Sequence, residues 1–127
     1  MPIKRDAADI AFSKAIRKRD GSCMVCYKTE TNECAHIVGR RNKAVRWCAM
    51  NALSLCHYHH RHFTENPLAF NDFLMGIYGE GHLELLREKS RAIYKTNKAE
   101  RALIAKHYRE ELKKMEDDPE HELVSWN

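Results

Sequence analysis

The chain has 127 residues and a formal net charge of +4 at pH 7, and 43% of its residues are hydrophobic. This length fits a single domain, because so short a chain cannot bury two separate cores. The spread of apolar residues argues against disorder outside the ends, and no apolar run approaches the ~18 residues of a membrane span. The N-terminal segment has no apolar signal core, so we expect a cytoplasmic protein.

The first segment, residues 1–21, is predicted to be an N-terminal helix. Asp6 is a suitable N-cap, and the pair Asp20-Gly21 is a typical helix end. Between them, one stripe of apolar residues recurs with helical spacing: Ala8, Phe12, Ala15 and Ile16. The stripe indicates a helix with one buried face.

Residues 22–64 are predicted to form a small α+β core. Short strands flank a turn at 29–32, and a loop rich in Arg and Lys follows at 39–51. Residues 51–56 form a short half-buried segment that leads into a helix starting near His57. All five Cys and five of the eight His fall in this region, which makes it the candidate site of chemistry.

The C-terminal part is predicted to be a helical extension over residues 65–118, followed by a frayed acidic tail at 119–127. We expect the helices to pack on the small core. A surface that binds a protein partner is the alternative.

Local signals place the helices of this extension. Residues 66–67, Asn-Pro, are a typical helix start, and Gly79 ends that helix. A second helix is expected over residues 82–95. The last helix opens with Asn97 as its cap and Glu100 three residues later, a variant of the capping box.

Two half-sites have the spacing of zinc ligands. Cys23 and Cys26 form a Cys-x-x-Cys pair, and Cys56 and His59 have the same spacing about thirty residues later. In a reducing compartment, clustered Cys and His favour a metal over disulfides. Because four protein ligands leave no open coordination position, the zinc would be structural and would stabilise the fold.

A second assignment of the zinc ligands takes Cys34 with His36, or Cys48, and leaves Cys56 and His59 in the core. We rank it second because it would use His36, the histidine best placed for a reaction. Cys34 and Cys48 fit well as buried thiols.

The order of these residues resembles the HNH endonucleases, also called ββα-metal nucleases. The shared pattern is Cys-x-x-Cys, then His36 within Ala-His-Ile, then Asn51, then a Cys-x-x-His pair directly followed by His60. The resemblance covers about residues 22–64 and is strongest to small phage and prophage nucleases. It implies a zinc-stabilised ββα-metal core that hydrolyses phosphodiester bonds of DNA.

The resemblance implies a role for each matching residue. His36 would be the general base that deprotonates the attacking water, and Asn51 would brace the loop between the strands. His60 would bind the catalytic cation, Mg²⁺ or Mn²⁺. This set suits the reaction, which needs a base active near neutral pH and a cation that stabilises the developing charge.

The sequence departs from the family at one position. The residue before the base is commonly an Asp or His that binds the catalytic cation, and here it is Ala35, which cannot bind a metal. The cation would then rest on His60 with water, phosphate oxygens or another side chain. The candidates are Cys34, His62, Glu65 and Asn51.

Positive charge is concentrated in the half of the chain that carries these motifs. Residues 1–66 contain 12 Lys and Arg against 6 Asp and Glu, whereas residues 67–127 contain 10 against 12. The predicted nucleic-acid-binding residues lie in the basic loop: Arg40, Arg41, Lys43 and Arg46. Contacts with phosphates would give affinity that is independent of sequence and sensitive to salt. The patch could extend to residues 17–19.

The sequence therefore predicts a DNA endonuclease or nickase that depends on a divalent metal, in the cytoplasm of a bacterial host if a phage encodes it. Branched or single-stranded DNA is the expected substrate by analogy with phage recombination nucleases. The first rival is a non-catalytic, zinc-stabilised DNA-binding module. The second is an adaptor whose C-terminal helices bind a protein.

Overall fold

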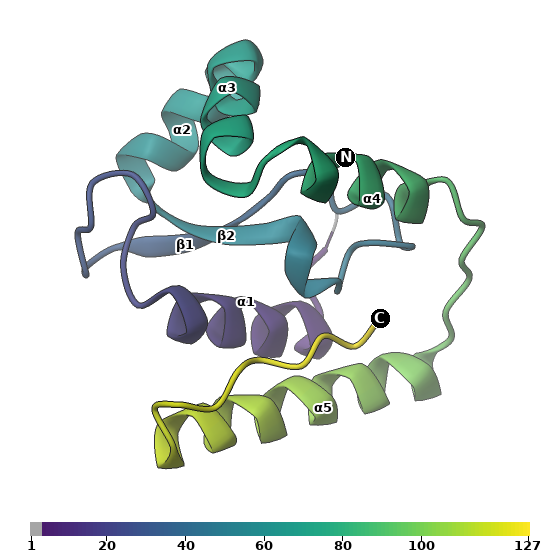
Figure 1. Ribbon diagram of the computed structural model, residues 1–127. Helices are drawn as coiled ribbons and strands as arrows, with labels where there is room; N and C mark the ends of the chain where they lie inside the picture. Colours follow the sequence, from purple (N-terminus) through teal and green to yellow (C-terminus); the bar gives the residue numbers. More distant parts are fainter. Residues whose placement is uncertain (1–3) are drawn as a thin grey trace.

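The computed structural model describes residues 4–127 and shows the expected α+β fold, in which five helices surround a two-stranded sheet (Figure 1). The elements follow in chain order: α1 (Ala7–Asp20), β1 (Asn32–His36), the 3-10 helix η1 (Ala49–Asn51), β2 (Ala52–Cys56), α2 (His57–Glu65), α3 (Pro67–Tyr78), α4 (Glu80–Ser90) and α5 (Lys98–Asp117). None of the helices in residues 4–127 has the length and apolar character of a membrane span.

The sheet lies between two layers of helices. Strands β1 and β2 pair antiparallel, with Asn32 opposite Cys56 and His36 opposite Ala52. Helices α1 and α5 cover one face, and α2, α3 and α4 lie on the other side (Figure 1). Every residue of β2 is buried because both faces of this strand are covered. The sheet therefore holds the end of β2, the start of α2 and strand β1 in fixed relative positions.

Helix α1 forms where the sequence predicts it. The N–H of Asp9 donates to the Asp6 carboxylate at 3.0 Å, and the N–H of Asp6 donates to the Asp9 carboxylate at 2.9 Å. This capping box satisfies two N–H groups that the first turn leaves without helical partners. At the other end Gly21 has a φ of +74°, the left-handed conformation that suits glycine.

The apolar stripe of α1 packs on α5. The ring of Phe12 meets the ring of Tyr108 edge-on, with centroids 4.9 Å apart. Phe12, Ile16 and Ile104 are almost completely buried in this interface. The predicted stripe thus belongs to the largest apolar cluster of residues 4–127 and fixes α1 beneath the sheet.

The ends of the predicted helices agree with the structure where local capping signals exist. Helix α3 begins at Pro67 and ends before Gly79, and Asn97 caps α5 by accepting from the N–H of Glu100 at 2.8 Å. The helix expected over 82–95 is present with different bounds, because α4 runs from Glu80 to Ser90. Ile93, which follows the end of α4, is 92% exposed.

The expectation of a frayed tail is also wrong. Residues 119–127 fold back along α5, where Trp126 and Leu123 pack against the core. The carboxylate of Glu111, 2% exposed, accepts from the Val124 N–H at 2.8 Å. Although burial raises its pKa, contacts with His121, the Val124 N–H and Lys114 lower that pKa to about 2. The buried charge needs these partners, and two of them come from the tail.

Arg46, predicted to bind phosphate, is instead buried. It is 4% exposed, and its guanidinium donates two hydrogen bonds to the carboxylate of Asp9, at 2.9 and 2.5 Å. Both side chains of this ion pair are almost fully covered. Arg46 therefore anchors the basic loop to α1, and Asp9 balances its charge.

Replacing Arg46 with Met should destabilise the protein by about 3–5 kcal/mol, because the Asp9 carboxylate would stay buried without its partner. Urea denaturation measures this change as a lower free energy of unfolding. Lys43→Met is the matched control, since Lys43 is exposed on the same loop and its loss should change the free energy by about 0.5 kcal/mol or less. Equal effects of the two substitutions would contradict the structural role of Arg46.

Candidate metal centre and adjoining pocket

Four side chains converge at the end of β2, and they are the predicted zinc ligands. Their ligand atoms all lie within 4.8 Å of one another: Cys23, Cys26, Cys56 and His59. The Sγ atoms of Cys26 and Cys56 are 3.8 Å apart, and Cys56 Sγ lies 3.2 Å from His59 Nδ1. Tetrahedral zinc with bonds of ~2.0–2.3 Å separates its ligands by about 3.3–3.8 Å. The cluster therefore has the chemistry and spacing of a closed, structural zinc site.

The fold brings these residues together through two local structures. Cys23 and Cys26 lie in a tight turn closed by two backbone bonds: the Cys23 N–H donates to Lys28 and the Tyr27 N–H donates to Cys23. Tyr27 has a φ of +62°, which closes this turn. Cys56 ends β2 and His59 lies in the first turn of α2. The alternative ligand sets with Cys34, His36 or Cys48 are not the ones that converge.

The backbone around the cluster favours thiolates, which are the form that binds metal. Burial opposes ionisation of Cys23, but the N–H groups of Cys26, Cys56 and Val25 outweigh it and lower the pKa of this thiol. The pKa of Cys26 is raised, because burial and the sulfurs of Cys23 and Cys56 together outweigh the N–H of Lys28. A cation among the sulfurs would remove this repulsion.

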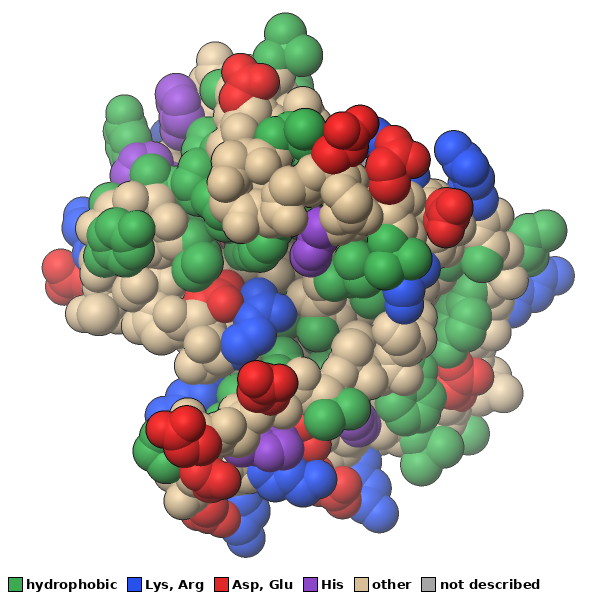
Figure 2. Space-filling view, viewed as in Figure 1, with side chains coloured by type: hydrophobic (Ala, Val, Ile, Leu, Met, Phe, Trp, Pro, Cys, Tyr) green, Lys and Arg blue, Asp and Glu red, His purple; other side chains and the backbone are tan. Residues whose placement is uncertain are grey.

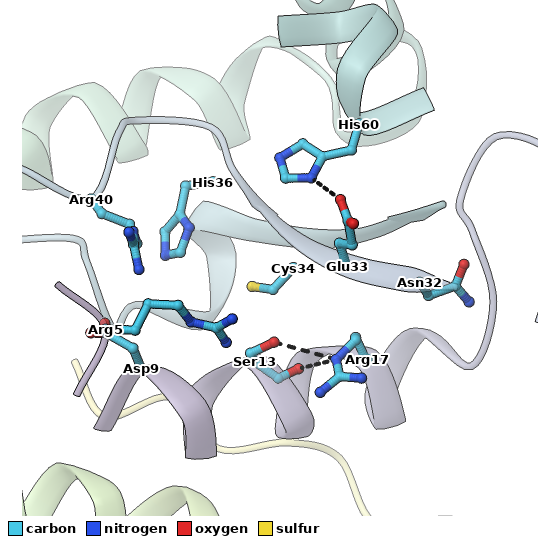
Figure 3. A pocket seen from close by; sticks show the side chains of 10 residues that line it. All are labelled: Arg5, Asp9, Ser13, Arg17, Asn32, Glu33, Cys34, His36, Arg40 and His60. Atoms are coloured by element: carbon cyan, nitrogen blue, oxygen red, sulfur yellow. Dashed lines mark hydrogen bonds and ion pairs between the residues drawn. The ribbon is translucent and has the colours of Figure 1, made fainter. Parts of the chain in front are cut away.

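A pocket of about 590 Å³ lies between α1, β1 and the start of α2 (Figure 3). His36 lines it from the end of β1 and His60 lines it from α2. Arg5, Arg17 and Arg40 supply positive charge to the same pocket. The structure thus places the predicted base and the predicted cation ligand at one cavity, directly beside the metal cluster, because His60 follows His59.

His36 is held with one nitrogen available for chemistry. Its Nε2 lies 3.0 Å from the backbone oxygen of Arg46. Because a carbonyl only accepts, Nε2 carries the proton and Nδ1 keeps its lone pair. Burial is the largest influence on His36 and lowers its pKa to about 4, with nearby Arg40 acting in the same direction. His36 is therefore a neutral imidazole at physiological pH, oriented by the loop carbonyl and by the ring of Phe12 at 5.7 Å.

His60 has a carboxylate partner that the sequence analysis missed. Glu33 Oε1 lies 2.7 Å from His60 Nδ1 (Figure 3). Glu33 Oε2 lies 3.0 Å from His57 Nδ1. Burial raises the pKa of Glu33, but the bonds with His57 and His60 outweigh it and lower the pKa. The carboxylate is ionised and accepts a hydrogen bond from the Nδ1–H of His60. Nε2 is then the nitrogen of His60 that is left to bind a cation.

The alternation of a strand could have indicated Glu33. Residues two apart on a strand point to the same side, and Glu33 lies two positions before Ala35. Glu33 is thus a carboxylate on the same side of β1 as Ala35. The extra ligands proposed on α2 are less suitable: among the residues that line the pocket, neither His62 nor Glu65 is present.

Asn51 is completely buried and braces the loop that follows β1. Its Oδ1 accepts from the Val38 N–H at 2.7 Å, and its Nδ2 donates to the carbonyls of Val38 and Val45 at 2.9 and 3.0 Å. These are the loop-bracing contacts that were expected of Asn51. They hold both ends of the segment that carries Arg40 and Arg41, close to His36.

The basic residues of the prediction divide into three groups. Arg40 lines the pocket with His36, whereas Arg41 and Lys43 line a neighbouring pocket, and Arg46 is the buried ion-pair residue. Arg17 lines the first pocket and donates from Nε to Ser13 at 3.3 Å.

Other basic residues near α1 also differ from the prediction. Arg19 is structural, because it donates to the carbonyls of Ala49 and Ala52, both at 2.8 Å. Arg5 lines both pockets, and no motif or spacing in the sequence indicates this role.

The fold and the site together define a small α+β protein with a candidate Cys₃His metal centre beside a basic, histidine-lined pocket. Comparisons with known protein families, curated proteins and solved structures found no match.

Proposed function

We propose that the protein is a DNA endonuclease or nickase of the HNH type, dependent on a divalent metal. The observation that carries the proposal is that His36 and His60 line one pocket beside the Cys₃His cluster. A base and a cation ligand on opposite elements leave room between them for a phosphodiester. The three arginines of the pocket favour an anionic substrate there.

In the proposed reaction His36 accepts a proton from the attacking water at Nδ1. The bond from its Nε2–H to the Arg46 carbonyl keeps the ring in the tautomer that makes this transfer feasible. Arg17 and Arg40 stabilise the negative charge that develops on the phosphate. A cation held by His60 would polarise the phosphate and stabilise the leaving oxygen.

Glu33 compensates in this proposal for Ala35. A carboxylate that accepts from one nitrogen of an imidazole orients the ring and makes the other nitrogen a better ligand. Glu33 stands in this relation to His60, and its second oxygen is held by His57. Glu33 is thus a positioning residue for the cation site, on the same strand as the base.

Replacing Glu33 with Ala should raise the Mn²⁺ concentration needed for half-maximal DNA cleavage by about 10–100-fold. Glu33→Gln keeps an acceptor oxygen and should recover part of the loss. Glu30→Gln is the control, because Glu30 is an exposed carboxylate in the turn before β1. An unchanged Mn²⁺ dependence of Glu33→Ala would remove Glu33 from the proposal.

The function is tested by incubating the purified protein with supercoiled plasmid, single-stranded DNA and a four-way junction, each with Mg²⁺, Mn²⁺ or Ni²⁺. The proposal predicts nicked or cut product that requires an added cation. Binding of DNA without cleavage under any cation would support the DNA-binding module, which the loss of the family's metal ligand at Ala35 favours. Absence of DNA binding at moderate salt would support the adaptor.

A further inference from the structure

A second basic pocket adjoins the first and has no role in the proposed reaction. Its volume is about 500 Å³, and six of its lining residues are basic: Lys4, Arg5, Arg41, Lys43, Arg46 and Arg101. They come from three segments far apart in the chain: the residues before α1, the loop after β1 and the first turn of α5. This concentration of charge therefore arises from tertiary folding and not from a run of basic residues in the sequence.

Only part of this charge is balanced by the acids around it. Arg46 is paired with Asp9, and Arg101 lies 3.5 Å from Asp6, the acidic residue of the pocket lining. Lys4, Arg5 and Lys43 form no ion pair within residues 4–127, so the lining keeps a positive excess. In addition, Nε of Arg101 is buried and has no hydrogen-bond partner among residues 4–127. A group with acceptor oxygens would satisfy both features.

The two pockets adjoin each other. Arg5 lines both of them. Asp9 lines the first and Arg46 lines the second, so the ion pair between these two residues connects the linings of the two pockets. An extended anionic polymer could therefore occupy both sites at once, whereas a small anion would fill only one.

We propose that the second pocket binds another backbone phosphate of the strand whose phosphodiester lies between His36 and His60. This inference rests on the proposed function and specifies its substrate: a strand that continues beyond the cleaved bond across the N-terminal end of α1. The site consists of cations, so it reads the backbone and not the bases. Helix α5 takes part in DNA binding through Arg101, although it is remote from the motifs.

The test measures binding separately from cleavage. The variant Lys43→Gln with Arg101→Gln is compared with Lys113→Gln with Arg109→Gln, which changes two exposed cations elsewhere on α5. Both double variants are made in a His36→Ala background, so that the DNA is bound but not cut. The fluorescence anisotropy of a labelled single-stranded oligonucleotide then gives the affinity for DNA over a series of salt concentrations. Lys43→Gln alone serves if loss of Arg101 lowers the melting temperature.

Neutralising the second pocket should weaken binding and lower the slope of log K against log salt by about one for each lost phosphate contact. When the same substitutions are made in the protein that retains His36, the rate of hydrolysis of bis(p-nitrophenyl) phosphate should stay unchanged, because this substrate has no neighbouring phosphate. Unchanged affinity and slope would overturn the inference while leaving the proposed function intact. Effective competition by inorganic phosphate at the same concentration as strand phosphates would also overturn it, because the pocket would then be a small-anion site.

Discussion

Replacing Cys56 with Ser is expected to unfold the core of residues 22–64. Structural zinc sites contribute about 10–16 kcal/mol in small domains, which is as large as the whole stability of a typical domain. Cys56 both belongs to the metal cluster and joins β2 to α2, so its loss affects the sheet and the helix that carries His60. Circular dichroism and the metal content of the purified protein measure the effect.

The matched control is Cys34→Ser, which changes a thiol of β1 that lies outside the cluster. It should keep one zinc per chain and the melting temperature of the parent to within a few degrees. A strong chelator should reproduce the effect of Cys56→Ser in the parent protein. A parent that contains no zinc, or that keeps its fold after complete removal of the metal, would contradict a structural role for the cluster.

Replacing His36 with Ala is expected to lower the maximal rate of DNA cleavage by about 10²–10⁴-fold, which is the usual contribution of a general base. The fold and the affinity for DNA should change little, because the phosphate contacts come from arginines. A cleavage assay under saturating Mn²⁺ with equal amounts of bound DNA measures the loss.

The same residue sets the expected pH dependence. Protonation would remove the lone pair of His36, and its pKa is lowered to about 4, so the base stays neutral between about pH 6 and pH 8. Titration of His36 should therefore cause no loss of rate in that window. His82→Ala is the control, since its Nε2 also lies near a backbone oxygen, that of Met50, but His82 is not among the pocket residues. Equal rates for His36→Ala and His82→Ala would show that His36 is not the base.

The features that the sequence predicts well depend on short stretches of chain. The two pairs of zinc ligands each fit within one turn, so their spacing alone indicates that they share a metal. The helix ends at Asp6, Gly21 and Asn97 follow from local backbone bonds that need few neighbours. The same local patterns locate β2 and the start of α2, whereas the strand expected before the turn at 29–32 does not form and β1 begins at Asn32.

The features that the sequence does not reveal depend on contacts between distant residues. Arg46 resembles the other cations of its loop until the fold places Asp9, 37 positions earlier, against it. The tail is acidic and rich in turn residues, but the buried carboxylate of Glu111 holds it in place. Glu33 can be recognised as a partner of His57 and His60 only once α2 is packed over β1.

The charge of a segment, like the role of a single residue, depends on contacts that the sequence does not reveal. On the face in Figure 2, acidic side chains gather around the C-terminal end of α5, in agreement with the negative balance of the second half of the chain. Yet Arg101, on that same helix, lines the second basic pocket. The balance of a whole segment therefore does not identify which of its residues meet a polyanion.

The proposed hydrolytic centre is tested most directly by the Mn²⁺ dependence of plasmid cleavage by the parent, His36→Ala and His60→Ala, each shown to retain its zinc. We expect the parent to cut with a saturable requirement for Mn²⁺, and His60→Ala to need far more Mn²⁺ for half-maximal rate. His36→Ala should keep the half-maximal concentration of the parent with a greatly reduced maximal rate. A parent that never cuts DNA, or two variants that cut as it does, would contradict the proposal that His36 and His60 form a hydrolytic centre.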